Sequence, residues 1–313
     1  MMTPSHRRNA NQGEIEVNMR NLMLACVLAS LAGAAAAATP AMHVRKPVKA
    51  EPVLASQTGS AQASRPGAAP AAKPVALRPT KLSAAEIVDR NVAARGGLQA
   101  WRAVQTLAFS GQLEAGGKKN PQLPFVMEMK RPHKSRLEVR FQDQTAFQVY
   151  DGAQGWKVRP FLNRNEVEAF TPDEAKLAAA WAELDGPLVD YASKGTKIHV
   201  DGIESVEGRD AYRLKLTLKS GAERHMWIDA KTFLEAKIDG DPRRMDGRLR
   251  NVAIYYRDFR RENGLMVPHV LETVVEGVGT SHRMSIEKVA VNQSLDDKLF
   301  AKPQLQVAVA SPK

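Results

Sequence analysis

From about residue 107 onward, hydrophobic and polar residues alternate along the chain with a period of two. Leu107, Phe109 and Leu113, for example, alternate with Ser110 and Gln112. This period places successive side chains on opposite faces of a strand that is buried on one side. It predicts strands around residues 107–113, 125–130, 136–141, 147–149, 156–158, 198–200, 203–206, 212–218, 225–229, 233–238, 252–259, 267–275 and 284–291.

The segments between these predicted strands are mostly short, and the chain shows no regular alternation of strands with helices. Short turns favour antiparallel neighbours, because a parallel pair needs a long crossover. The pattern therefore predicts a mainly β protein with some α (class α+β). We expect one large, strongly curved antiparallel sheet or open barrel, with helices packed on one side.

A helix is predicted just before the first strand. Ser83 and Glu86 have the spacing of a capping box, in which each side chain satisfies an unpaired backbone amide of the first turn. The helix is expected to run to about Arg95 and to end at Gly96-Gly97, where glycine adopts a left-handed turn without penalty. A short turn then presents Trp101.

A second helix is predicted among the strands. Thr171 is its expected N-cap, followed by Pro172 at the first helical position. Leu177, Trp181 and Leu184 follow at spacings of four and three, which places them on one helix face. The sequence Asp-Gly-Pro at 185–187 is expected to end this helix.

Aromatic residues divide the chain into two parts. Every Phe, Trp and Tyr lies after residue 82, so residues 1–82 lack the large side chains that a hydrophobic core needs. Residues 39–82 are rich in Pro and Ala, which is typical of a disordered tether. We expect one folded domain over residues 83–303, followed by a C-terminal tail at 304–313.

Residues 19–38 have the features of a secretory signal peptide. Met19 and Arg20 precede an apolar run, and a series of alanines ends at Ala38. We therefore expect translation to start at Met19, residues 1–18 to be a mis-started extension, and the protein to be exported to the periplasm of a Gram-negative envelope. Retention of the apolar run as a membrane anchor is the alternative.

The net charge of +11 is concentrated in the N-terminal part. Residues 1–82 contain ten Lys/Arg and three Asp/Glu, whereas the rest contains 35 and 31. A nearly balanced folded domain does not indicate nucleic-acid binding. The basic tether could still make peripheral contact with an anionic membrane.

The sequence lacks the common signatures of catalysis. It contains no phosphate-binding glycine loop, no H-E-x-x-H pattern and no G-x-S-x-G elbow. Cys26 is the only cysteine and lies in the signal segment, so we expect neither disulfides nor a thiolate site in the mature protein. No cofactor, no metal and no enzymatic activity are predicted, although a site assembled from distant residues is an alternative.

Large apolar residues recur on the early predicted strands. Met127 and Met129 are flexible and polarisable, which suits contact with acyl chains. Two interpretations follow: these residues surround an apolar cavity under the helices, or they form an ordinary core between the sheet and the helices. Taken alone, the residues favour the second interpretation, an ordinary core.

Several segments resemble the LolA-like outer-membrane lipoprotein-sorting family. They are residues 94–97 (Ala-Arg-Gly-Gly) with Trp101 and Val104, 150–152 with 155–156 and 160–161, 185–191, 204–214, 226–233 (Met-Trp-Ile-Asp-Ala-Lys-Thr-Phe), Asp258 with 264–268, and Leu299-Phe300 with Pro303. The resemblance covers about residues 83–303. It implies an unclosed β-barrel, here of about 11 strands, with helices forming a lid over a hydrophobic cavity.

The long tether is unlike the compact start of that family's dedicated carriers. In addition, the inward-facing arginine that holds the lid in those carriers has no clear counterpart here; Arg136 and Arg140 lie on a plausible strand, and nothing selects between them.

The functional hypothesis is a periplasmic carrier that binds lipids or acylated lipoproteins during outer-membrane biogenesis. Its partners would include inner- and outer-membrane donor and acceptor proteins. The alternative is an envelope sensor or protein-interaction module of the same fold. The residues expected to line the hydrophobic cavity are Phe109, Phe125, Met127, Met129, Leu137, Val139, Phe147, Val149, Trp156, Phe161, Leu177, Trp181 and Trp227.

Overall fold

A computed structural model describes residues 77–114, 120–245, 247–279 and 281–304, all of which belong to one compact unit. The predicted signal segment, the tether up to residue 76 and most of the C-terminal tail lie outside the described residues. The tether residues that are described lie beside the sheet: the backbone N–H of Arg78 donates to the oxygen of Ile203 at 2.9 Å.

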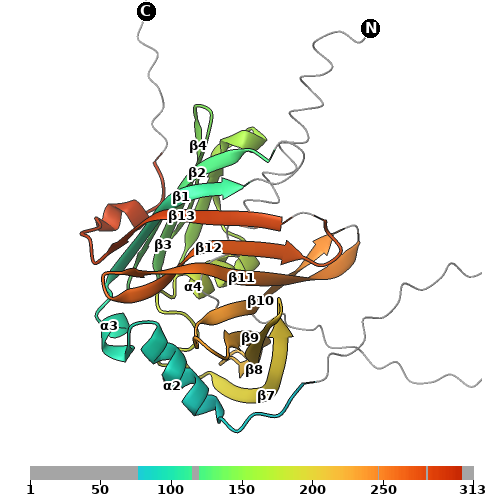
Figure 1. Cartoon of the computed structure of the whole chain (residues 1–313). Helices are drawn as coiled ribbons and strands as arrows, with labels where there is room; N and C mark the ends of the chain where they lie inside the picture. Colours follow the sequence, from blue (N-terminus) through green and yellow to red (C-terminus); the bar gives the residue numbers. More distant parts are fainter. Residues whose placement is uncertain (1–76, 115–119, 246, 280, 305–313) are drawn as a thin grey trace, which may run out of the picture. The chain divides into compact units, whose positions relative to one another are not determined.

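Thirteen antiparallel strands form one sheet (Figure 1). They are β1 (Thr106–Glu114), β2 (Gln122–Lys130), β3 (Lys134–Phe141), β4 (Gln144–Tyr150), β5 (Gly155–Arg159), β6 (Arg164–Ala169), β7 (Lys197–Val206), β8 (Arg209–Thr217), β9 (Glu223–Asp229), β10 (Glu235–Met245), β11 (Arg248–Glu262), β12 (Leu265–Val275) and β13 (Ser281–Val291).

The strands follow one another as in a meander, except that β1 pairs with β13. That pairing joins the two halves of the chain, and β6 and β7 are left at the two ends of the strand order. The sheet is curved and does not close. This confirms the predicted class and the predicted unclosed sheet.

The structure differs from the sequence-based elements in detail. β6 was not predicted, because Arg164–Ala169 is mostly exposed and carries no apolar alternation. The two strands predicted at 198–200 and 203–206 are one strand, β7, whose register shifts near Gly202. A shift of this kind resets the side-chain alternation, so one strand looks like two in the sequence.

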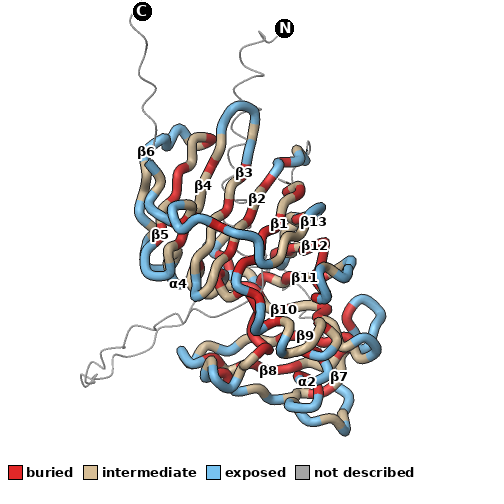
Figure 2. The backbone as a smooth tube through the Cα atoms, turned by 90° about the vertical axis from the view of Figure 1, so that its left-hand side faces the viewer, coloured by how far each residue is buried: buried red, intermediate tan, exposed pale blue. Residues whose placement is uncertain are grey.

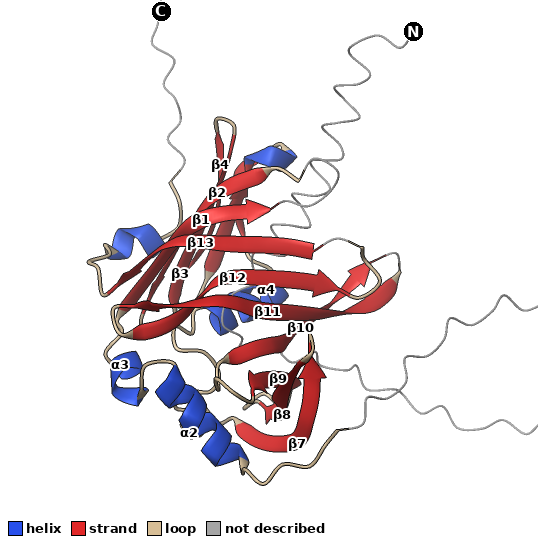
Figure 3. Ribbon diagram, viewed as in Figure 1, coloured by secondary structure: helices blue, strands red, loops and turns tan. Residues whose placement is uncertain are grey.

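The N-terminal helices α2 (Ala84–Ala94) and α3 (Leu98–Arg102) lie at one end of the sheet (Figure 3). Both hydrogen bonds of the predicted Ser83–Glu86 capping box are present. Gly96 has a φ of +115°, and a Cβ atom there would lie 2.5 Å from the oxygen of Gly264. Only glycine therefore fits this close approach between α2 and the β11–β12 turn.

Helix α4 (Pro172–Trp181) packs against β3, β4 and β5 within the curve of the sheet (Figure 3). Its N-cap is Thr171, which forms a capping box with Glu174. The prediction extended this helix to residue 184, but the helix ends at Trp181, so Leu184 belongs to the loop that follows. We call residues 172–196, which comprise α4 and this loop, the lid segment.

Burial follows the strands in the alternating manner that the sequence indicates (Figure 2). In β2, for instance, Phe125, Met127 and Met129 are buried, whereas Val126 and Glu128 are partly exposed. No helix among the described residues is both long enough and apolar enough to cross a membrane.

Candidate functional site

Strand register assigns each side chain to one of the two faces of the sheet, because directly opposite residues of an antiparallel pair point to the same side. Phe109 lies opposite Met127, and Met127 lies opposite Leu137. Leu107 lies opposite Met129 in the same way. We call the side that carries these residues the inner face.

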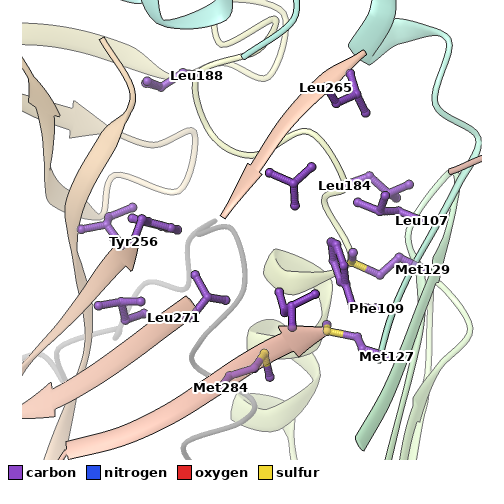
Figure 4. Packing of buried hydrophobic residues seen from close by; sticks show 14 of the residues in the cluster. Leu107, Phe109, Met127, Met129, Leu184, Leu188, Tyr256, Leu265, Leu271 and Met284 are labelled. Atoms are coloured by element: carbon purple, nitrogen blue, oxygen red, sulfur yellow. The ribbon is translucent and has the colours of Figure 1, made fainter. Parts of the chain in front are cut away.

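The inner faces of both halves of the sheet meet in one hydrophobic cluster. Phe109 and Met127 of β1 and β2 share it with Met226 of β9 and Met284 of β13. Figure 4 shows side chains of β1, β2, β11, β12 and β13, together with Leu184 and Leu188 of the lid segment, pointing toward one another. Strands so far apart in the sheet order can share a cluster only on the concave side, so the inner face is the concave one.

Eight of the thirteen residues predicted to line a cavity belong to this cluster or pack against it. The cluster contains Phe109, Phe125, Met127, Met129, Leu137, Val139 and Phe161, and Leu177 of α4 packs against it. These side chains are well buried: Phe125 is 2% exposed and Met129 is 0% exposed. A ligand would therefore reach them only if segments packed on the inner face moved.

Phe147, Val149 and Trp156 lie on the opposite, outer face. Val149 is directly opposite Trp156 in the register and next to Arg136 of β3, whereas the inner residue Leu137 pairs with Gln148. The three residues were expected beside the inner residues, but the pairing turns them to the other side of the sheet.

Two 3-10 helices are present among the described residues, η1 (Pro160–Leu162) after β5 and η2 (Asp297–Phe300) near the C-terminal end, and η2 covers part of that outer face. Phe147 and Val149 pack there with Leu295, Leu299 and Phe300. These outer apolar residues are thus covered by the C-terminal part of the chain and not by the lid segment.

Trp227 also lies on the outer face, where it pairs with Arg213 of β8 and Lys237 of β10. The Lys237 ammonium lies 3.9 Å from the centre of the indole ring, and the indole N–H donates to Glu204 at 2.9 Å. Trp227 packs in a small outer apolar cluster with Val206, Ala211 and Ala236, separate from the main cluster. It also borders a hollow of about 600 Å³ that is lined by charged and apolar residues. The side chain of Trp181, the last of the thirteen, lies outside the described residues.

Helix α4 covers the inner face mostly with small side chains, whereas the loop that follows it buries Leu184, Leu188 and Val189 in the main cluster. Leu177 and Ala180 of α4 pack against the main cluster, and Ala178 and Ala182 pack around Tyr150. An alanine buries far less apolar area than a leucine or phenylalanine, and hydrophobic stabilisation scales with buried area. The apolar contacts of α4 with the sheet are therefore weak for a helix of its length.

A buried ion pair fixes the first turn of α4 to the inner face of β5. The Lys157 ammonium donates to Glu174 Oε2 at 2.6 Å, and Glu174 also accepts the backbone N–H of Thr171 at 2.8 Å. Burial alone would raise the pKa of Glu174, but these hydrogen bonds and the Lys157 charge hold that pKa below its ordinary value. The carboxylate therefore stays ionised at neutral pH.

A second ionic anchor holds the loop after α4. Asp185, whose side chain is 4% exposed, accepts from Arg131 at 2.8 Å and from Lys194 at 2.6 Å. Burial opposes ionisation of Asp185, yet these two cations keep its pKa below the ordinary value. Glu183 shares Lys194 at 3.1 Å, and its pKa is raised by burial.

Arg95, at the C-terminal end of α2, makes buried polar contacts. The sequence did not identify it as a residue that holds the lid segment. Its Nη1 donates to the backbone oxygen of Asp185 at 2.8 Å, and its Nε lies 3.2 Å from Glu235. The guanidinium also stacks on Trp101, 4.2 Å from the ring centre. Arg95 thus joins α2, α3, β10 and the lid segment.

Arg136 and Arg140, the two candidates from the sequence, make no such contact. Arg136 pairs with Glu138 and lies over the ring of Phe147, on the outer face. Arg140 also pairs with Glu138 and is 62% exposed. Arg95 belongs to the Ala-Arg-Gly-Gly segment that resembles the family. The sequence does not show, however, that the side chain of this helix-capping residue turns toward the interior.

The described residues contain no group of three or more His, Cys, Asp or Glu side chains that could hold a metal ion. What the arrangement offers instead is an apolar inner surface, a covering helix with weak apolar contacts, and ionic anchors at both ends of that helix.

Comparisons with known proteins give matches among solved structures only. No family model matches the sequence, and no curated protein matches it. A LolA superfamily protein from Nitrosomonas europaea is 15% identical with a TM-score of 0.47, over 71% of this chain and 98% of that one. A DUF1329 family protein from Desulfovibrio piger is 15% identical with a TM-score of 0.49, over 69% and 95%.

A proposed outer membrane lipoprotein-sorting protein domain from Vibrio parahaemolyticus is 12% identical with a TM-score of 0.46, over 69% of this chain and 95% of that one. The resemblance seen in the sequence is thus found again among solved structures.

Proposed function

We propose that this protein is a carrier in the bacterial envelope that holds acyl chains of lipids or lipoproteins against the inner face of its sheet. The observation that carries the proposal is the combination of a continuous apolar inner face with an alanine-rich lid helix anchored by Lys157–Glu174 and by Asp185. Apolar cargo could replace the few apolar contacts of α4, whereas a permanent cover would bury larger side chains.

The inner face suits acyl chains of varied shape. Met127, Met129, Met226 and Met284 all belong to its cluster, and the unbranched methionine side chain adapts to irregular apolar partners. Burial of about ten methylenes at about 0.8 kcal/mol each would provide about 8 kcal/mol. The free energy of opening the lid segment is subtracted from this, so loading and release both depend on a closed state that is only moderately stable.

The proposed location is the periplasm, because residues 19–38 have the pattern of a secretory signal. The proposed partners are a donor at the inner membrane and an acceptor at the outer membrane. No enzymatic step is needed for this role: transfer requires only that cargo be more stable on the acceptor.

The test is to purify the protein under mild conditions, identify bound lipids by mass spectrometry, and titrate the stripped protein with a fluorescent acyl probe. We expect co-purified acyl lipids and micromolar or tighter probe binding. Phe109→Ala, on the inner face, should weaken binding, whereas the matched outer-face variant Phe147→Ala should not.

Absence of both co-purified lipid and probe binding would overturn the carrier proposal. Equal effects of the two variants would mean that the inner face is not the binding surface. A stable protein partner whose binding ignores acyl loading would instead support the sensor or interaction module considered from the sequence.

A further inference from the structure

A groove of about 540 Å³ lies between α2 and residues 188–193 near the end of the lid segment. Val88, Val92 and Ala93 form its α2 wall, and Leu188 and Tyr191 belong to the opposite wall. Its volume falls within the range of about 300–1,000 Å³ that small-molecule sites occupy.

The floor of this groove is part of the main hydrophobic cluster. Val88 is 2% exposed, Leu188 is 1% exposed, and both belong to the cluster that covers the inner face of the sheet. Tyr191 and Leu98 line the groove as half-buried residues and pack against the same cluster. The groove opens to solvent, and the packed side chains at its base separate it from the inner face that is proposed to hold cargo.

The rim of the groove is polar. Asp190 pairs with Arg102 of α3, with 2.9 Å between Oδ2 and Nε, and its backbone oxygen accepts the hydroxyl of Ser193 at 2.8 Å. Asp89 of α2 is exposed on the other side. An apolar floor with a polar rim matches an amphiphile whose chain is buried and whose head stays in water.

The wall formed by residues 188–193 continues directly from the loop that Asp185 anchors. Asp190 has a φ of +52°, a left-handed conformation that costs a non-glycine residue free energy unless its surroundings fix it. Here Arg102 and Ser193 fix it. Movement of the lid segment would therefore also move one wall of the groove.

We propose that this groove takes one acyl chain of the cargo and is where the chain passes between solvent and the inner face. The inference rests on the proposed carrier function and specifies its entrance. The Arg102 and Asp190 charges offset each other and Asp89 adds a negative one, so the rim disfavours an anionic head. The proposed occupant is an amphiphile with an uncharged head.

Two substitutions that test this proposal each narrow the groove, one from each wall. Ala93→Trp fills it from α2, and Ala192→Trp fills it from the opposite wall. Ala85→Trp is the matched control, because Ala85 is an exposed alanine of the same helix that does not line the groove. The probe is a fluorescent monoacylglycerol, and circular dichroism and thermal unfolding report whether each full-length variant folds.

We expect Ala93→Trp and Ala192→Trp to slow probe uptake at least 10-fold and Ala85→Trp to leave it unchanged. If Ala93→Trp fails to fold, Ala192→Trp decides alone, since it changes an exposed loop residue. If a folded groove variant takes up the probe at the wild-type rate, the groove is not the entrance, but the proposed carrier function is unaffected. No uptake by the wild-type protein would overturn both.

Discussion

The inner and outer faces of β3 and β4 belong to the same strands but have covers of different kinds. On the outer face, Val149 lies under Leu295 and Phe300, large side chains from the C-terminal part of the chain. On the inner face, the same strands lie under α4, which offers Leu177 and several alanines. The large apolar area that Leu295 and Phe300 bury stabilises the outer cover. Helix α4 buries less apolar area on the inner face, so its attachment depends more on ion pairs.

Hydrophobic residues on a strand therefore do not by themselves identify a binding surface. Apolar residues lie on both faces of β4, Ala146 and Tyr150 inside and Phe147 and Val149 outside, but only the inner face is covered by a helix, α4, that makes few apolar contacts. Each of the following predictions tests whether the inner cover opens more easily than the outer one.

The largest expected effect comes from truncating the outer cover. Phe300→Ala removes a side chain that is 1% exposed and should lower the free energy of unfolding by about 3–5 kcal/mol. Leu177→Ala, the corresponding change in the inner cover, should cost about 1 kcal/mol because Leu177 is only half-buried. Urea unfolding of both variants measures the difference, and equal losses would contradict the comparison.

Removal of the charge at the second anchor should come next. Asp185→Asn leaves Arg131 and Lys194 without their carboxylate, and because those cations are partly exposed the loss should be about 2 kcal/mol. Hydrogen exchange should speed up in residues 182–196 and stay unchanged in η2. Exchange that rises equally in η2 would show that Asp185 stabilises the whole fold and not the lid segment alone.

The two capping boxes provide a matched pair of smaller effects. Thr171→Ala and Ser83→Ala each remove one N-cap hydroxyl and should each cost about 1 kcal/mol. Only Thr171→Ala should also accelerate amide exchange in α4 and exchange of a bound acyl probe. If Ser83→Ala accelerates probe exchange as much, α2 contributes to opening and the lid is larger than residues 172–196.

The smallest effect is a pH dependence of the first anchor. The pKa of Glu174 is lowered in the folded protein, so its contribution to stability is complete above the ordinary glutamate pKa of about 4.3 and is lost as the pH falls through the lower folded value. Amide protection of α4 should therefore be constant from about pH 7 to 5 and should fall below about pH 4. In Glu174→Gln, the amide protection of α4 should be low already at neutral pH. Wild-type protection in this variant at pH 7 would show that the Lys157–Glu174 ion pair does not anchor α4.

Much of the fold follows from local pattern. The capping residues Ser83 and Thr171 appear where the sequence places them, because a cap is a contact within four residues. Phe125, Met127 and Met129 lie on one face because a strand alternates its side chains. β6 was not predicted because it is a mostly exposed edge strand and lacks that alternation.

The candidate site was predictable only in part. Alternation places Phe147 and Val149 together on one face of β4, but it does not say which face is concave, and the pairing Val139–Ala146 turns them outward. Arg95 and Asp185 are 90 positions apart in the sequence, and no local rule connects them.

By itself, the sequence determined most of the strands, where α2 and α4 begin, and which side chains of a strand share a face, since each of these depends on neighbours within a few positions. The tertiary structure alone decided which face became the inside, which arginine met the lid segment, and which apolar residues received a permanent cover. Those choices depend on β1 pairing with β13 and on the curvature of the whole sheet, where contacts join residues far apart in the chain.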